Sequence, residues 1–263
     1  MGVLNITPDS FSDGGKYFSQ KSAFDRATQI IEEGADIIDI GGESSRPGAE
    51  PISESEELRR VMPIVEKIAS RFSIPISIDT YKSSVARSCI EIGASIINDI
   101  SAMQFAPKMI KVAKDSGAFV ILMHMKGSPK NMQDLPEYKD VISEIITFFK
   151  NRLNEVTLGK IDLDKIIIDP GIGFGKSVIH NYTILRDLNA MNVLGVPILI
   201  GTSRKSFIGK TLNLPESERF EGTAASVTAA ILNGARIVRV HDIKKIKRVV
   251  SITDSIKDVG RKS

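Results

Sequence analysis

Eight short apolar runs, spread along the whole chain, constrain the fold more than any other feature of the sequence. They are rich in isoleucine and valine and lack simple in–out alternation, as expected for strands buried on both faces. Helix-like segments separate them, for example residues 54–70 and 243–257. In chain order the runs are Val3–Ile6, Asp36–Ile40, Ile74–Ile78, Ser95–Ile100, Ala118–Met123, Lys165–Ile168, Val196–Ile200 and Arg236–Val240. The alternation predicts eight β-α units.

Eight such units in 263 residues match a single (β/α)8 TIM barrel better than a doubly wound sheet, for which eight strands would be many. Glycines follow several helix-like segments and read as helix C-caps that feed the next strand; they are Gly34, Gly93, Gly117 and Gly234. No linker or low-complexity segment divides the chain. We therefore predict one α/β domain over residues 1–263, with its active site at the carboxyl ends of the strands.

Composition narrows the class of protein. Hydrophobic residues make up 42% of the chain, enough for a large core, and the net charge of +3 with mixed signs gives no sign of a nucleic-acid surface. Cys89 is the single cysteine, which excludes a disulfide framework and a cysteine-rich metal site. We find no run of about 18 apolar residues and no signal-peptide pattern. The sequence predicts a soluble cytoplasmic protein without a membrane partner.

A polar or reactive side chain stands near the end of every predicted strand. In chain order these are Asn5, Glu43, Asp79, Asn98 with Asp99, His124, Asp169, Ser203 to Lys205, and Arg239 with His241. In a TIM barrel the strand ends converge on one face. A single polar residue there could be a satisfied cap or core group. Eight of eight predict an enzyme or a small-molecule binder.

The residue types indicate the ligand. The carboxylates and amide of Asp79, Asn98 and Asp169 suit a flat heterocycle with paired N–H donors. Basic residues suit the anionic parts of a substrate; they are Arg46, Lys205, Arg239 and His241. No Cys–His or Ser–His–Asp arrangement can be assigned, and three histidines make no metal cage. A reaction that needs a strong protein nucleophile is not expected.

Eight motifs together resemble one family. In order they are MGVLNITPDSFSDGG, GGESSRPGA, SIDT, INDIS, MHM, IDPGIGFGK, GTSRKSFIG and RVHD. They resemble the dihydropteroate synthases of folate biosynthesis, over essentially the whole chain. The resemblance implies a TIM barrel, usually homodimeric. It also implies condensation of 6-hydroxymethyl-7,8-dihydropterin diphosphate with p-aminobenzoate, with release of pyrophosphate and the help of Mg²⁺.

The resemblance also implies a role for each matching residue. The metal and the diphosphate would be held by Asn5, Asp13, Ser45 and Arg46. The pterin would be bound by Asp79, Asn98 and Asp169, with Lys205 beside the ring and Ile100 and Met123 as apolar walls. p-Aminobenzoate would be surrounded by Phe11, Pro47, Phe174, Ser203 and Lys205, its carboxylate near Ser203 and a helix starting at Arg204. The residues expected to be catalytic are Asp13, Arg46, Lys205, Arg239 and His241.

The implied mechanism is loss of diphosphate followed by attack of the neutral aniline nitrogen, so no strong general base is required. Residues 41–49 (GGESSRPGA) are expected to form a flexible loop that brings Arg46 to the leaving diphosphate. Ser45 stands where the family commonly has threonine. The motif also starts at Met1, whereas relatives usually carry a preceding segment, so we expect a less ordered first strand.

Other residues have simpler interpretations. Asp39, Asp99 and Glu43 are expected to brace loops, and His180 to lie exposed in a loop. Two alternatives to the synthase remain. A pterin-dependent methyltransferase acting with a corrinoid protein would share the pterin-binding residues, but not the long first two loops or the SRK lysine. A non-catalytic pterin-binding paralogue would have no use for the diphosphate-binding residues.

Overall fold

The computed structural model describes residues 1–7, 16–44, 48–127 and 137–260. Its strands are β1 (Gly2–Asn5), β2 (Ile38–Gly41), β3 (Ile76–Asp79), β4 (Ile96–Asp99), β5 (Phe119–Met123), β6 (Ile166–Asp169), β7 (Leu199–Ile200) and β8 (Ile237–Val238). Each strand overlaps one of the eight apolar runs of the sequence. The predicted strand order along the chain is therefore confirmed.

Helices alternate with these strands. They are α1 (Lys16–Glu32), α2 (Glu54–Arg71), α3 (Ser83–Glu91), α4 (Met109–Ser116), α5 (Val141–Leu158), α6 (Val178–Arg186), α7 (Ser206–Leu212), α8 (Phe220–Leu232) and α9 (Ile243–Lys257). Gly34, Gly93, Gly117 and Gly234 all have positive φ, which confirms their predicted role after helices. Among the described residues, we find no helix with both the length and the apolar character needed to cross a bilayer.

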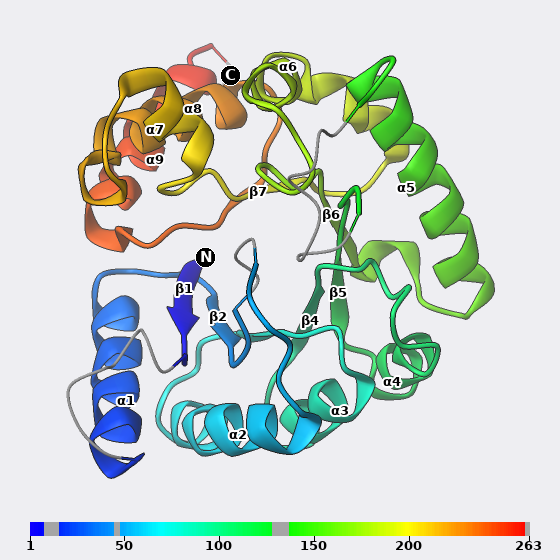
Figure 1. The fold of residues 1–263 in the computed structure, drawn as a ribbon, viewed down its shortest axis with the longest axis vertical. Helices are drawn as coiled ribbons and strands as arrows, with labels where there is room; N and C mark the ends of the chain where they lie inside the picture. The colour runs from blue at the N-terminus through cyan, green and yellow to red at the C-terminus, as the bar shows by residue number, and fades with distance from the viewer. Residues whose placement is uncertain (8–15, 45–47, 128–136, 261–263) are drawn as a thin grey trace.

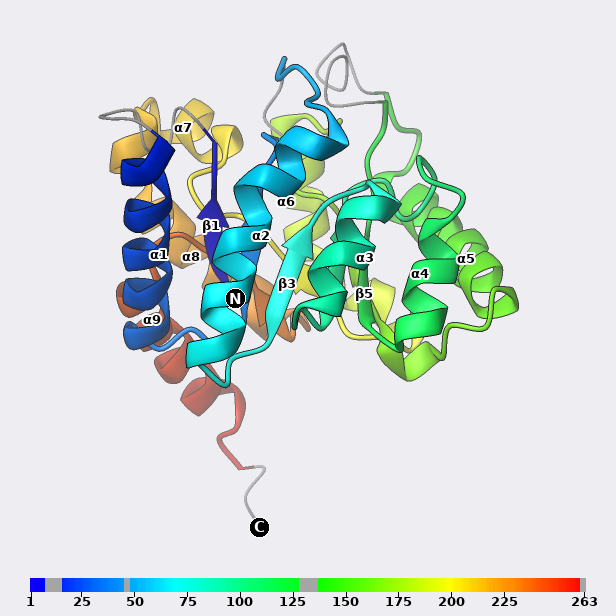
Figure 2. The same ribbon diagram turned by 90° about the horizontal axis from the view of Figure 1, so that it is seen from below.

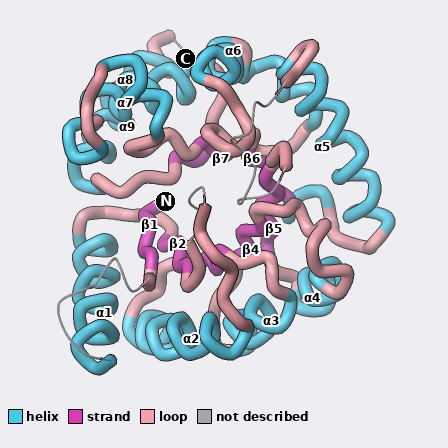
Figure 3. The backbone as a smooth tube through the Cα atoms, viewed as in Figure 1, coloured by secondary structure: helices cyan, strands magenta, loops and turns pink. Residues whose placement is uncertain are grey.

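The strands close into a barrel. Strands β1 to β6 form one parallel sheet in chain order, and β7 pairs with β8 in a second, parallel ladder. Isolated bridges join the two ladders on both sides, Gly2 with Val240 and Ile168 with Ile198. The strands stand inside a ring of helices (Figures 1 and 3). The TIM barrel predicted from the sequence is confirmed.

The amino end of the barrel is filled with apolar side chains. Met1, Ile96, Ile121, Ile167 and Leu199 form one buried cluster. Because they come from strands around the ring, they occupy its interior, as the layered filling of TIM barrels requires. The first strand is ordered: Met1 donates from its amino group to the carbonyl of Val238, and its own carbonyl accepts from Val240. The expectation of a less ordered first strand is therefore wrong.

The loops beyond the carboxyl ends of the strands lie at the opposite end of the barrel from the C-terminus. In the side view of Figure 2, the segment that leads into α2 stands at one end, and the last turn of α9 stands at the other. The apolar filling at the amino end leaves the carboxyl ends of the strands as the place where polar side chains gather. The fold therefore presents the predicted site residues on one face.

Candidate active site

Arg239 lies at the centre of the polar layer. Directly after β8, it donates from Nε to Oδ2 of Asp39 at 2.6 Å and from Nη2 to Oδ2 of Asp79 at 2.8 Å. Asp39 is fully buried within β2, and Asp79 ends β3. Burial alone would lower the pKa of Arg239, but the two carboxylates raise it above its ordinary value. The guanidinium group therefore stays charged and fixed.

Asp39 also orients Asn98. Its Oδ1 accepts from the Ser77 hydroxyl at 2.6 Å, and both of its oxygens lie 3.3 Å from Nδ2 of Asn98. Because a carboxylate only accepts hydrogen bonds, the amide nitrogen of Asn98 must face Asp39. The amide oxygen of Asn98 then points away as an acceptor. Asp39 was expected to brace a loop; instead it positions two residues of the predicted site.

Asp169 ends β6 and supplies a second carboxylate. Its Oδ1 accepts from the backbone N–H of Gly171 at 2.7 Å. Burial raises the pKa of Asp169, whereas that hydrogen bond and the charges of Lys205, Arg239 and Lys176 lower it. Burial also raises the pKa of Asp79 to about 7, again opposed by Arg239. The pKa of both carboxyl groups therefore stays above its ordinary value, and the cations limit that rise in favour of the ionised forms, which accept N–H donors.

Apolar side chains lie beside these acceptors. Ile100, Met123 and Phe174 form a separate buried cluster, against which Tyr81 and Met125 pack. The Nζ atom of Lys205 stands 4.2 Å from the centre of the Phe174 ring, a cation–π distance. Acceptors, apolar walls and a cation thus lie together at the carboxyl ends of β3 to β7. A flat heterocycle with N–H donors and an anionic substituent suits this combination.

His241 and Ser203 form a pair close to Arg239. Nδ1 of His241 lies 3.0 Å from Oγ of Ser203, which also accepts from the His241 backbone N–H. Burial and the nearby Arg239 lower the pKa of His241 to about 4. His241 is therefore neutral near pH 7 in the ligand-free protein. Arg204 does not begin the following helix: it has a left-handed backbone (φ 58°), and α7 starts at Ser206.

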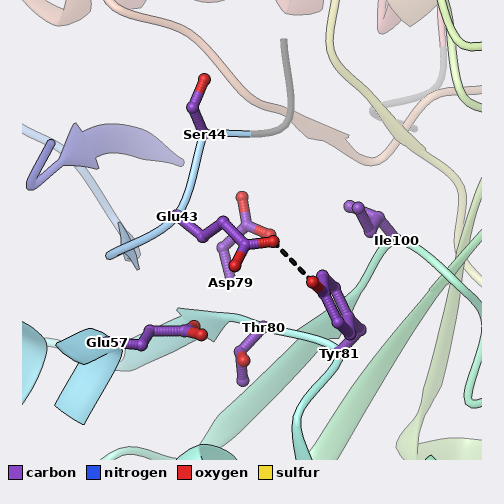
Figure 4. A pocket seen from close by; sticks show the side chains of 7 residues that line it. All are labelled: Glu43, Ser44, Glu57, Asp79, Thr80, Tyr81 and Ile100. Atoms are coloured by element: carbon purple, nitrogen blue, oxygen red, sulfur yellow. Dashed lines mark hydrogen bonds between the residues drawn. The ribbon is translucent and has the colours of Figure 1, made fainter. Parts of the chain in front are cut away.

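A small pocket opens beside Asp79, where β2 and β3 end (Figure 4). It is lined by Glu43, Ser44, Glu57, Asp79, Thr80, Tyr81 and Ile100. Glu43 accepts hydrogen bonds from the Tyr81 hydroxyl and the Lys82 amine, both at 2.6 Å, and from the backbone N–H of Ile52 at 2.9 Å. The prediction that Glu43 braces its loop is confirmed.

Asp99 was predicted to brace a loop and His180 to lie exposed in one, and the structure shows the contacts of both. Asp99 accepts from the backbone N–H groups of Ser101 and Met103, which confirms a loop-bracing role. His180 does not lie in a loop. It occupies the first turn of α6, where its Nδ1 accepts from the Ser177 backbone in a capping box. Tyr138 packs edge-on against its ring, and the side chain is half-buried.

The position of Asn5 bears on the predicted metal. Asn5 ends β1, and its Oδ1 and the Oδ2 of Asp79 both lie 3.7 Å from where a side chain on Gly41 would begin. These are hard oxygen donors of the kind that Mg²⁺ prefers. Within the described residues no group of three or more His, Cys, Asp or Glu is suited to a metal.

Most of the predicted site residues come together. Those at the carboxyl ends are Asn5, Asp79, Asn98, Ile100, Met123, Asp169, Phe174, Ser203, Lys205, Arg239 and His241. Five others lie outside the described residues: Phe11, Asp13, Ser45, Arg46 and Pro47. Their predicted roles stay predictions. Sequence reasoning missed Lys176, a buried lysine whose only signal was its place at the end of the IDPGIGFGK motif.

The sequence of this chain is similar to those of known proteins. Residues 1–241 match the family described as pterin binding enzyme. Dihydropteroate synthase of Escherichia coli strain K12 is 46% identical over 264 residues, which cover 99% of this chain and 93% of that protein.

Solved structures agree. Yersinia pestis dihydropteroate synthase in complex with a sulfonamide drug has a TM-score of 0.93 at 43% identity, covering 98% of this chain and 94% of that one. The Xanthomonas albilineans enzyme with 4-aminobenzoic acid has a TM-score of 0.92 at 39% identity, covering 98% and 92%. Similarity at this level extends over nearly the full length in sequence and in fold. The chain therefore belongs to the dihydropteroate synthases of the pterin-binding enzyme family.

Proposed function

We propose that this chain condenses 6-hydroxymethyl-7,8-dihydropterin diphosphate with p-aminobenzoate to give 7,8-dihydropteroate and pyrophosphate. The observation that carries the proposal is the convergence of Asp79, Asn98 and Asp169 on an apolar cluster next to Arg239 and Lys205. Two relatives with this fold were solved with 4-aminobenzoic acid and with a sulfonamide drug. 4-Aminobenzoic acid is the second substrate of this reaction, and a sulfonamide mimics it.

Pterin recognition follows from the acceptors. An ionised Asp169 can accept two parallel N–H donors, as a carboxylate does from arginine. The amide oxygen of Asn98, held outward by Asp39, accepts a further N–H. Ile100 and Met123 cover the faces of the flat ring, and Lys205 stands at its edge over Phe174. These contacts align the pterin methylene with the anion-binding side of the site.

The leaving diphosphate meets positive charge. Arg239 holds a fixed charge, and His241 gains one if an adjacent anion raises its pKa from about 4. Asn5 and Asp13 would hold Mg²⁺, which when bound neutralises charge on the departing diphosphate. The bond between the methylene carbon and the diphosphate oxygen breaks first, and the electron-rich pterin delocalises the positive charge left behind. The neutral aniline nitrogen then attacks that carbon and releases its proton afterwards.

The test is a pyrophosphate-release assay with both substrates and Mg²⁺. We expect release to depend on p-aminobenzoate and to yield 7,8-dihydropteroate. The matched variant is Asp169→Asn, which keeps the size of the side chain and removes its charge. Absence of pyrophosphate with both substrates present would refute the proposal. Methyl transfer that requires a corrinoid protein would favour the methyltransferase instead.

We further propose that the chain is a cytoplasmic homodimer. Exposed apolar side chains on α8 and α9 support self-association; they are Leu232, Ile252, Ile256 and, just beyond α9, Val259. Cys89 is buried and unbridged, which is consistent with a reducing compartment. Light scattering that returns twice the mass of 28.7 kDa would support the dimer. A monomer at micromolar concentration would contradict it.

A further inference from the structure

Lys176 is a buried amine at the end of the segment that joins β6 to α6. Only 4% of the residue is exposed. Its Nζ atom lies 2.9 Å from the carbonyl oxygen of Phe174, 3.3 Å from that of His124 and 3.0 Å from Nδ1 of the His124 ring. An ammonium group has three N–H donors, and three acceptors surround this one. Its hydrogen-bonding capacity is fully used inside the protein.

The contact fixes the protonation state of His124. When Lys176 is charged, its ammonium group can only donate, so Nδ1 of His124 accepts and its Nε2 carries the proton. Burial and the charge of Lys176 lower the pKa of His124 to about 2. His124 is therefore a neutral acceptor. Its ring also packs edge-on against Phe148, with ring centres 4.8 Å apart.

Two segments meet at this amine. Gly171 has a positive φ of 70°, and a side chain there would collide with the carbonyl oxygen of His124. Gly175, at φ 62°, would likewise collide with the carbonyl oxygen of Lys126. The backbone N–H of His124 donates to the carbonyl of Asp169 at 2.9 Å. Segment 170–175 therefore lies directly against the end of β5, and Lys176 binds a carbonyl group on each side of the contact.

The site depends on this segment. Asp169 precedes it, and Phe174, within it, packs with Ile100 and Met123. The charge of Lys176 also lowers the pKa of Asp169, against the burial that raises it. We propose that Lys176 is a positioning residue of the pterin site: its buried ammonium group fixes segment 170–175 against β5 and presents a positive charge to Asp169. The inference rests on the proposed function, since it assigns Lys176 to pterin binding.

Several charged or titratable groups surround this pair. Lys205, before α7, and Arg239, after β8, lower the pKa of Asp169, and Lys205 also lowers that of Lys176. Lys176 in turn lowers the pKa of His124, after β5, and of His180 in α6. Lys126 acts on His124 and His180, and the Tyr138 hydroxyl donates to the carbonyl of Gly175 beside Lys176. Burial lowers the pKa of Lys176 to about 7, opposed by Asp169. Lys176 is therefore more fully charged at pH 6 than at pH 8. Its support of the Asp169 carboxylate is greatest at the lower pH.

The first test replaces Lys176 by methionine, which has a similar length and no donor. The probe is 6-hydroxymethylpterin, titrated calorimetrically into the wild-type protein and Lys176→Met. We expect the dissociation constant to rise about tenfold at pH 6, where Lys176 is charged, as for loss of a hydrogen bond from a charged group. The ratio of variant to wild type should shrink as the pH is raised to 8, because Lys176 of the wild type loses its own charge above a pKa of about 7. Lys114→Met, an exposed lysine on α4, is the matched control and should bind like the wild type.

A second pair of variants does not depend on the folding of Lys176→Met. Leucine and asparagine have the same shape, but only asparagine offers an acceptor near the position of Nδ1. We expect His124→Asn to bind the pterin several-fold more tightly than His124→Leu. Wild-type affinity in Lys176→Met, a pH-independent ratio, or equal affinity of the two His124 variants would overturn the inference while leaving the proposed function intact. A wild-type protein that binds no pterin would overturn both.

Discussion

Replacing Arg239 by methionine removes the cation that joins β8 to β2 and β3. The change leaves two carboxylates, Asp39 and Asp79, without the guanidinium group that now lies 2.6 and 2.8 Å from them. Asp39 is fully buried, and the Asp79 side chain is 14% exposed. We expect the fold to persist, because the barrel ladders do not involve this side chain, but to lose stability.

The size of the loss follows from what remains. Breaking a buried ion pair by removing one partner costs about 3–5 kcal/mol, because an uncompensated charge stays behind. Asp39 keeps its hydrogen bonds from Ser77 and Asn98, and the Arg239 side chain is itself 20% exposed. Both facts place the expected loss of unfolding free energy near the lower limit, about 3 kcal/mol. The control Arg59→Met breaks an exposed pair with Glu56, which should contribute less than about 1 kcal/mol.

The loss should depend on pH. Burial raises the pKa of Asp79 from 3.8 to about 7 in the folded protein. The folded state therefore binds a proton that the unfolded chain lacks, and the contribution of Asp79 to stability falls as the pH rises through that window. Without Arg239, which lowers this pKa, the window extends to higher pH. The difference between wild type and Arg239→Met should be larger at pH 8 than at pH 5.

Urea unfolding at these two pH values measures the effect, with an unchanged m-value as the condition for comparing free energies. A loss no greater than that of Arg59→Met would refute the buried ion pair as a source of stability. So would a loss that is the same at both pH values. Either result would mean that Asp39 and Asp79 tolerate the absence of Arg239.

Three further predictions concern ligands. Asp169→Asn should weaken pterin binding by about 1–3 kcal/mol in calorimetry, because a buried N–H loses its charged acceptor; unchanged affinity would remove Asp169 from the pterin site. His241→Ala should lower turnover and weaken pyrophosphate binding. In the wild type that binding should take up a proton at pH 6, since an anion raises the pKa of His241 from about 4; titration in two buffers of different ionisation enthalpy measures the uptake, and none would contradict the assignment. A sulfonamide should bind measurably only with pterin, pyrophosphate and Mg²⁺ present, because Phe11 and Pro47 are expected to complete its pocket; equal affinity without them would show a preformed pocket.

Much of this architecture was readable from the sequence, because strands buried on both faces leave a distinct pattern. Runs such as Ala118–Met123 and Lys165–Ile168 contain the observed β5 and most of β6. The helix α6 was harder to recognise at its start. The usual capping box has Glu or Gln three residues after the cap, whereas His180 fills that position here, so the start of α6 lacks the common sequence pattern.

The sequence predicted most of the residues of the site, but not which of them form hydrogen bonds with one another. Asp39 and Arg239 are 200 residues apart, and only closure of the barrel brings them within 2.6 Å. Nothing in the run that contains Asp39 distinguishes a carboxylate that holds an arginine from one that braces a loop. Lys176 was missed for a related reason. A lysine usually reaches solvent, and the burial of Lys176 depends on the carbonyl oxygen and ring nitrogen of His124, which lies 52 residues away in the chain.

The six-stranded sheet (β1 to β6) and the two-stranded ladder (β7 and β8) differ in their stability against local unfolding. Strands β2 to β5 pair through ladders on both sides, while β7 and β8 are two residues each and join the six-stranded sheet through single bridges. Amide protons in short, weakly bridged segments exchange with solvent sooner than those in a continuous sheet. Asp79, Asn98 and Asp169 lie in the six-stranded sheet, and Arg239 directly follows β8 of the two-stranded ladder. A ligand that binds all four should therefore slow deuterium uptake in β7 and β8 most of all, so that substrate occupancy would be recorded in the backbone of two strands.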